Sequence, residues 1–277
     1  MPMKKINDTR LFYEESGSGE AIIFHHGYTG AHDVWLDEIS PRLNDSYRCI
    51  VMDCRGAGDS EHPETGYNIP QYAADVIAVA DALELEEFTY VGHSMGGGIG
   101  YQLGINHGER LKKLVLVAPI PSAGIKAPRK VHEKAKETRS HPDARDLMIA
   151  ERLLLRLRAP KEVIIKTVDR ALSVSAGHFD ESWQSMLDFN VQNRLDELRT
   201  PTLMIAGAAD GLCAANVNDW QRLPMAALHV FSRVGHGIPR EVPEEFSAVL
   251  RDFLEHGVVN AATQQKKLED ADQHKGN

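Results

Sequence analysis

The chain has 277 residues, of which 42% are hydrophobic and 26% charged, and its formal net charge is −9. This length fits one large domain, or a core with an inserted subdomain. An acidic chain lacks the basic surface that non-specific nucleic-acid binding requires, so we expect no nucleic-acid partner. No apolar run approaches the ~18 residues of a membrane-spanning helix, and we expect no membrane partner.

The N-terminus and the cysteines favour a cytoplasmic protein. Residues 1–7 contain no apolar stretch that could serve as a signal peptide. The three cysteines, Cys49, Cys54 and Cys213, are odd in number and lack metal-ligand spacing, as is typical of a reducing compartment. The thirteen histidines include no H-x-x-x-H or H-E-x-x-H pair. We therefore expect neither a metal nor another cofactor.

Strand and helix patterns alternate through the first 118 residues, and this alternation predicts an α/β fold with a mainly parallel sheet and helices on both faces. A leading pair of strands precedes the alternation. Asn68 is a candidate helix cap, and Pro70 then falls in the first turn of that helix. Strands are expected at 4–7, 10–15, 21–25, 47–52, 88–91 and 113–118, and helices at 32–43, 70–85 and 100–106.

The pattern changes after residue 118, where helical periodicity continues to residue 200 with no strand-like run. Strand patterns then return at 201–206 and 227–232, each followed by a helix. We therefore predict a core formed by residues 1–118 and 201–257, a helical cap (a lid) at 119–200, and a flexible polar tail at 258–277. The cap helices are expected at 129–140, 144–158, 161–172 and 180–195.

A serine flanked by glycines lies between a buried strand and a helix, in the segment Gly92-His93-Ser94-Met95-Gly96. Glycine at both −2 and +2 suits a tight strand-to-helix turn, because larger side chains there would collide. Such a turn holds Ser94 Oγ clear of the sheet as a nucleophile. The amide of Met95, at the helix N-terminus, can then face a developing negative charge. The alternative is an ordinary glycine-rich loop.

A serine nucleophile needs a general base and an acid that orients it. Asp210 and His236 follow the two late strands on glycine-containing loops, in the chain order serine, acid, histidine. Parallel strands bring such loops to one edge of the sheet. We therefore predict a catalytic triad of Ser94, His236 and Asp210. Alternatively, Asp210 caps the next helix and His236 is a surface turn residue.

Acyl transfer also requires a second donor to the oxyanion, from the loop after the early central strand. Gly27 lets this loop approach the substrate, and we expect the Tyr28 amide to act with that of Met95. The Tyr28 side chain either lines the acyl pocket or packs under the cap.

Taken together, these motifs resemble the α/β-hydrolase superfamily, in particular its capped serine hydrolases, which include esterases, lactonases, non-heme haloperoxidase-like enzymes and carbon–carbon bond hydrolases. The resemblance covers about residues 10–256 and implies the Ser-His-Asp mechanism, with Arg55 as a structural brace. Aspartate takes the nucleophile position in dehalogenases and epoxide hydrolases of this fold, so Ser94 argues against both. The matching segments are His26-Gly27-Tyr28, Asp53-Cys54-Arg55-Gly56-Ala57-Gly58-Asp59-Ser60, Gly92-His93-Ser94-Met95-Gly96-Gly97, Gly207-Ala208-Ala209-Asp210 and Gly235-His236.

The cap segment carries more Lys and Arg than Asp and Glu, whereas the remainder of the chain is strongly acidic. A basic cap could steer an anionic substrate, and Arg152 and Arg156 share a helix face for this purpose. The alternative is a solvated helix face with extended arginines. Candidate substrate-binding residues in the cap are His178, Phe179, Trp183 and Met186. Packing of the cap against the core explains these four equally well.

The sequence thus predicts a cofactor-independent serine hydrolase for a small or medium carboxylic ester or lactone, a small-molecule substrate. One alternative is hydrolysis of a carbon–carbon bond in a diketone-type acid, which uses the same triad. Another is a non-catalytic ligand receptor on the same fold. The sequence does not specify the oligomeric state.

Overall fold

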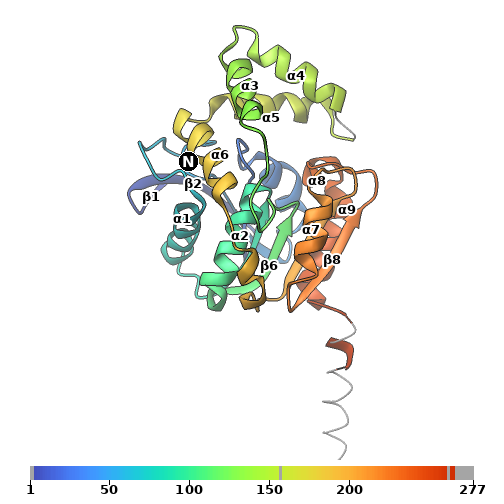
Figure 1. Ribbon diagram of the computed structural model, residues 1–277. Coiled ribbons are helices and arrows are strands. Elements are labelled where there is room, and N and C mark those ends of the chain that lie inside the picture. The colour runs from blue at the N-terminus through green and yellow to red at the C-terminus, as the bar shows by residue number, and fades with distance from the viewer. Residues whose placement is uncertain (1–2, 156–157, 261–262, 266–277) are drawn as a thin grey trace, which may run out of the picture.

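The computed structural model describes residues 3–155, 158–260 and 263–265, and these residues contain one eight-stranded sheet (Figure 1). The strand β2 runs antiparallel to both of its neighbours, whereas every pair from β4 to β8 is parallel. This is the predicted α/β architecture with its leading hairpin. In spatial order the strands are β1 (Met3–Ile6), β2 (Thr9–Ser16), β4 (Tyr47–Met52), β3 (Glu20–His25), β5 (Phe88–His93), β6 (Leu111–Val117), β7 (Thr202–Gly207) and β8 (Ala226–Phe231).

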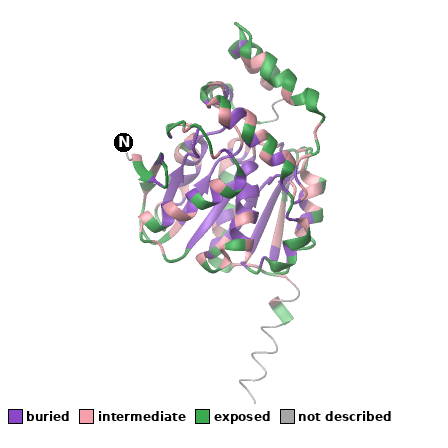
Figure 2. Cartoon of the chain, turned by 60° about the vertical axis from the view of Figure 1, so that its left-hand side comes forward, coloured by how far each residue is buried: buried purple, intermediate pink, exposed green. Residues whose placement is uncertain are grey.

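Helices cover both faces of the sheet, and each face has its own apolar core. Successive residues of a strand point to opposite faces, so Ile23 joins one core while Ile22 and Phe24 join the other. The first core is completed by α1 (Ile69–Ala82) and α2 (Met95–Asn106). The second is completed by a π-helical turn η1 (Trp35–Ile39) and by α9 (Pro243–His256). The sheet is therefore buried on both sides, as Figure 2 shows.

Four helices are inserted between β6 and β7, at the end of the sheet where the parallel strands finish (Figure 1). They correspond to the expected cap, and Figure 2 shows that the outermost of them are largely exposed. The position of the insert is consistent with the cap, while its role as a lid stays a prediction. Arg156 and most of the polar tail lie outside the described residues. The inserted helices are α3 (Arg129–Ser140), α4 (Ala144–Leu155), α5 (Lys161–Ser173) and α6 (Ala176–Asp188).

The prediction of a single helix at 32–43 is wrong. The chain instead forms η1 and then a 3₁₀ turn η2 (Ser40–Arg42), with the Ser40 amide donating to Trp35 O. Pro41 explains the break, because it lacks an amide hydrogen and its ring collides with the carbonyl four residues earlier in a regular α-helix. Trp35 and Ile39 nevertheless face the core, as their spacing indicated.

The last cap helix also differs from the expectation of 180–195. It begins earlier, where Ser175 Oγ accepts a hydrogen bond from the His178 amide, and it ends at Asp188. The chain then turns away because the Val191 amide donates to Ser122 O at 2.7 Å, a tertiary contact that helical periodicity cannot reveal. A 3₁₀ helix η4 (Gln192–Glu197) follows.

The remaining short elements are η3 (Gly108–Arg110), α7 (Cys213–Trp220) and α8 (Ile238–Glu241). Across the described ranges of the chain, no helix combines the length and apolar character needed to cross a membrane.

Candidate active site

Ser94 occupies a sharp turn between β5 and α2, with a φ of 57°. This left-handed backbone is rare for a residue with a side chain and marks local strain at the predicted nucleophile. The turn is tight enough that a Cβ atom at Gly92 would lie 2.1 Å from Gly96 O. Only glycine fits at that position, in agreement with the collision expected from the sequence.

The structure brings Ser94, His236 and Asp210 together in one hydrogen-bonded chain. His236 Nε2 lies 2.9 Å from Ser94 Oγ, and His236 Nδ1 lies 2.7 Å from Asp210 Oδ2. The Asp210 side chain is 7% exposed, whereas that of His236 is 41% exposed. A buried carboxylate on Nδ1 holds the proton there and leaves Nε2 free to accept the serine proton. The imidazole at the same time faces accessible space.

His93 supports this arrangement from the residue before the serine. Its Nε2–H donates to the backbone carbonyl of His236 at 2.8 Å, so the side chain ties the turn of the serine to the loop of the histidine. Burial lowers the pKa of His93 well below its usual value, which keeps the ring neutral. The sequence analysis did not single out this role, because the spacing of His93 and His236 along the chain gives no signal for it.

The loop after β3 lies directly against the serine. A Cβ atom at Gly27 would be 2.9 Å from Ser94 Cβ, so the loop can pack this closely against Ser94 only because position 27 is glycine. Within the described residues, the amides of Tyr28 and Met95 donate no hydrogen bond to another part of the chain. Tyr28 adjoins Gly27 and Met95 adjoins Ser94, so these two amides without internal acceptors are the candidates for the predicted oxyanion site.

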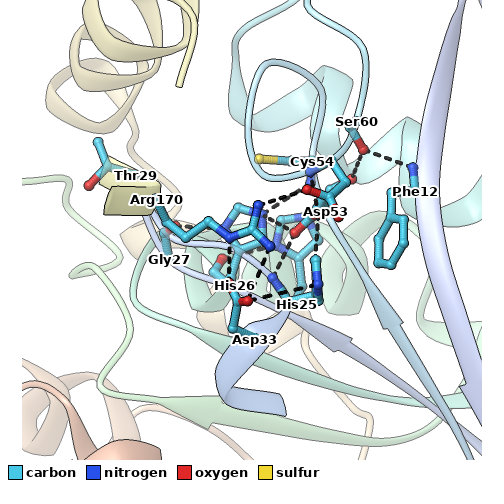
Figure 3. Close-up of polar contacts among 12 residues, drawn as sticks. Phe12, His25, His26, Gly27, Thr29, Asp33, Asp53, Cys54, Ser60 and Arg170 are labelled. Carbon is cyan, nitrogen blue, oxygen red and sulfur yellow. Dashed lines mark hydrogen bonds and ion pairs between the residues drawn. The ribbon is translucent and has the colours of Figure 1, made fainter. Parts of the chain in front are cut away.

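A buried carboxylate fixes the loop that carries Tyr28 (Figure 3). Asp53 accepts hydrogen bonds from the backbone amide and Nδ1 of His32, both at 2.7 Å, and from the Asp59 amide at 2.8 Å. Burial lowers the pKa of His32, but the bond to Asp53 outweighs it and the pKa is raised. The D-x-R-G-x-G-x-S segment therefore braces the loop, as the resemblance implied.

His26 makes the second connection in this network. Its Nε2 accepts the Cys54 amide at 3.1 Å, so Nδ1 carries the proton and donates to Gly27 O at 2.8 Å. Burial lowers the pKa of His26, which favours this neutral form. The side chain thereby orients the peptide between Gly27 and Tyr28.

The Tyr28 side chain points to the cap and packs against α6. Its hydroxyl donates to Phe179 O at 2.5 Å, and its ring stacks on His178 with the centroids 5.8 Å apart. His178 is fully buried; its Nδ1 lies 2.9 Å from Tyr72 Oη and its Nε2 accepts the Thr29 amide at 3.4 Å. His178 therefore supports the loop from behind. Of the two possibilities for the Tyr28 side chain, packing under the cap describes its main contacts.

A cavity of about 430 Å³ opens between this loop and the cap. Phe179 lines it, together with Tyr28. Trp183 stacks on His132 with the centroids 5.3 Å apart, and Met186 is fully buried in the core. Of the four cap residues predicted to bind substrate, the structure places Phe179 at the cavity wall, and His178 and Met186 beneath the surface.

The described ranges contain no group of three or more His, Cys, Asp or Glu side chains arranged to hold a metal ion. Cys49 and Cys54 are buried, and burial raises the pKa of both thiols, that of Cys49 to about 11. Thiols with raised pKa values are poor nucleophiles, so neither competes with Ser94.

The profile of the α/β-hydrolase fold family matches residues 20–239. The chain belongs to the α/β-hydrolase fold family. This α/β hydrolase is 28% identical over 267 residues to a non-heme chloroperoxidase of Streptomyces lividans, covering 89% of this chain and 96% of that protein. It is 30% identical to the 2-hydroxymuconate semialdehyde hydrolase of Pseudomonas sp. strain CF600, covering 88% and 90%.

Solved structures agree with this family assignment. The structure of Est816, described as an N-acyl homoserine lactone degrading enzyme, superposes with a TM-score of 0.76 at 28% identity and covers 91% of this α/β hydrolase and 100% of that chain. The known relatives thus differ in the reaction they are named for, although the fold is shared.

Proposed function

We propose that this α/β hydrolase cleaves a small or medium carboxylic ester or lactone through an acyl-enzyme intermediate on Ser94. The proposal rests on one observation, the continuous hydrogen-bonded chain from Ser94 Oγ through the His236 imidazole to the Asp210 carboxylate. The strained turn at Ser94 and the two unpaired amides beside it add support. No cofactor takes part in the proposed reaction.

In this mechanism Ser94 Oγ attacks the substrate carbonyl while its proton moves to His236 Nε2. The negative charge on the carbonyl oxygen is held by the amides of Tyr28 and Met95. Asp210 stabilises the imidazolium that forms. Collapse of the tetrahedral intermediate breaks the ester bond, and His236 returns the proton to the leaving oxygen. A water molecule activated by His236 then releases the acid and restores Ser94.

The test is a panel of acyl esters and lactones of varied chain length, assayed with the wild type and with Ser94→Ala. We expect Ser94→Ala to lower kcat on the order of 10⁴-fold or more, because the nucleophile is removed, while the thermal unfolding curve stays unchanged. Substantial turnover remaining in Ser94→Ala would contradict the covalent mechanism.

A second candidate is hydrolysis of a carbon–carbon bond in a diketone-type acid, which is favoured by the 30% identity to the semialdehyde hydrolase. Comparing kcat/KM for nitrophenyl esters with that for ring-cleavage-type dienoates distinguishes the two reactions. A ligand receptor is the remaining alternative. Multiple turnovers on any member of the panel would exclude it, whereas rapid labelling of Ser94 by a fluorophosphonate probe alone would not.

A further inference from the structure

A second cavity, of about 190 Å³, lies between the cap helices and the chain segment that follows His236. Gly237, the residue after His236, lines it together with residues of the cap helices. Arg240 from α8 contributes to its wall on the core side, and Arg152 from α4 contributes on the cap side. Arg152 also lines the cavity of about 430 Å³ beneath the cap, so the two cavities meet at this side chain.

Both arginines are half-buried, and neither has an anionic partner. Within the part of the chain that the structure describes, neither guanidinium makes a hydrogen bond or lies within 4.0 Å of a carboxylate oxygen. Burial lowers the pKa of both groups, and the charge of Arg152 lowers that of Arg240 further, to about 10. A cation that is partly removed from water is usually paired.

Other arginines of the chain show the opposite situation. Asp33 and Asp59 hold the Arg170 guanidinium and raise its pKa, and Asp169 does the same for Arg145 on α4. Arg152 and Arg240 line one cavity without an ion pair, and this sets them apart from these paired arginines. Their mutual repulsion disfavours this arrangement, and an anion between them would relieve it.

The carboxylates near the two arginines form no ion pair with them within the described part of the chain. Glu241 also lines the smaller cavity, but its Oε2 accepts the Gly235 amide at 3.2 Å and so supports the loop of His236. Asp33 influences Arg240 but binds Arg170 and Lys166 at 2.7 and 3.0 Å. Glu151 influences Arg152 without forming an ion pair with it. The missing anion is thus not supplied by these neighbours.

We propose that Arg152 and Arg240 form a subsite for a carboxylate group of the substrate, so that the ester or lactone cleaved at Ser94 is itself an acid. The planar guanidinium matches a carboxylate in shape and donors. The larger cavity, lined by the apolar side chains of Val131, Met148 and Phe179, would hold the uncharged part of the same molecule. This inference rests on the proposed hydrolase function and names its substrate class.

Two matched pairs of substrates test the subsite, each read by release of the nitrophenolate. The first pair is mono-4-nitrophenyl glutarate and its methyl ester, with the charge on the acyl side. The second is 3-carboxy-4-nitrophenyl pentanoate and 4-nitrophenyl pentanoate, with the charge on the leaving group. We expect the wild type to prefer the acid in one pair. Arg240→Gln and Arg152→Gln should each reduce this kcat/KM preference about tenfold or more, mainly through KM.

Arg145→Gln is the matched control, because Arg145 lies on the same helix as Arg152 but is exposed and paired with Asp169 at 2.6 Å. It should keep the wild-type preference. A wild type without preference in either pair would overturn the subsite, as would equal losses on the acid and its neutral analogue in the two arginine variants. Either result would leave the hydrolase function intact if esters are still cleaved.

A binding measurement separates the two proposals. The Kd values of both acids, mono-4-nitrophenyl glutarate and 3-carboxy-4-nitrophenyl pentanoate, are measured with Ser94→Ala, and again after Arg240→Gln is added. Weakening of about tenfold for either acid supports the subsite even if no ester is turned over, in which case the hydrolase function fails alone. Equal Kd values for the two proteins with both acids would overturn the subsite.

Discussion

At the scale of single residues, the site depends on backbone groups that side chains hold in place. The carbonyl of His236 accepts the Nε2–H of His93, and the Gly27 carbonyl accepts the Nδ1–H of His26. Both donors are buried histidines whose pKa values burial lowers, so they remain neutral donors at physiological pH. His93 and His26 thus hold backbone groups in position, whereas His236 transfers a proton in the proposed mechanism.

Replacing His93 tests this positioning role. We expect His93→Leu to lower kcat about tenfold with little change in KM, since the loop of His236 loses one buried hydrogen bond. His93→Gln places an amide nitrogen where Nε2 lies and should recover most of the activity. The measurement is the pH profile of kcat for both variants, with thermal unfolding as the check on folding. Equal activity of the leucine and glutamine variants would contradict the positioning role.

At the scale of elements, α5 of the cap is fastened to the core by an ion-pair cluster. Arg170 Nε lies 2.7 Å from Asp33 Oδ2, its Nη1 lies 2.7 Å from Asp59 Oδ1, and Lys166 Nζ lies 3.0 Å from Asp33 Oδ1 (Figure 3 includes Arg170 and Asp33). Asp33 follows the loop that carries Tyr28, and its side chain is only 14% exposed. The cluster therefore joins the cap to the segment that carries Tyr28.

This cluster predicts a sensitivity to acid. Burial raises the pKa of Asp33, but Arg170 and Lys166 lower it more, to about 2 from an unfolded value of 3.8. The stabilisation is thus complete above pH 4 and is lost as the pH falls through 2, and it amounts to about 2 kcal/mol. Asp33→Asn should lower the free energy of unfolding at pH 7 and flatten its dependence between pH 4 and 2.

Denaturant unfolding at several pH values measures this effect. Asp37→Asn is the control, because Asp37 binds the same Lys166 but is 48% exposed. It should change stability by about 0–1 kcal/mol. An Asp33→Asn protein with the wild-type pH dependence would show that the cluster does not stabilise the fold.

The bounds of a helix or strand could be predicted from the sequence where local contacts determine them, but not where distant contacts do. The strand at Tyr47–Met52 and the helix at Arg129–Ser140 were predicted with the observed bounds, because periodicity and flanking residues determine both locally. The predictions of a single helix around Trp35 and of the end of α6 were wrong. Pro41 interrupts the first helix, and a hydrogen bond to the distant Ser122 carbonyl redirects the chain after the second.

The candidate site divides in the same way. Ser94, Asp210 and His236 stand in recognisable local motifs, and the structure places them within hydrogen-bonding distance. The lack of a carboxylate partner for Arg152 and Arg240 among the described residues could not be inferred, because an unpaired arginine looks the same in sequence as a paired one. Residues predicted to bind substrate, such as His178, likewise look the same in sequence whether they line the cavity or are buried behind its wall.

At the scale of the whole molecule, one buried ion pair joins three separate segments. Arg55, in the turn after β4, donates to Asp75 of α1 through Nε at 2.7 Å and Nη2 at 2.8 Å, and to Asp8 of the leading hairpin at 2.8 Å. The side chains of Arg55 and Asp75 are each 1% exposed. A carboxylate so deeply buried is tolerable only with its partner.

Removing that partner should therefore destabilise the whole protein. We expect Arg55→Met to lower the free energy of unfolding by about 3–5 kcal/mol, because Asp75 is left buried without its cation. The double variant Arg55→Met with Asp75→Leu should recover much of the loss. Asp8→Asn, at an exposed end of the network, should cost about 0–1 kcal/mol. Chemical denaturation of the wild type, Arg55→Met, Asp75→Leu, the double variant and Asp8→Asn measures these values. A loss in the double variant equal to the sum of the two single losses would contradict the explanation.

Tyr28 belongs to two parts of the molecule at once. Its peptide adjoins Gly27, which packs against Ser94, while its phenol donates a hydrogen bond to the carbonyl of Phe179 on α6. If α6 moved outward to admit a ligand, it would pull on the same residue that is proposed to receive the reacting oxygen. The proposed oxyanion donor would then be displaced while the cap is open, and ester cleavage would require α6 to return to its position over the bound substrate.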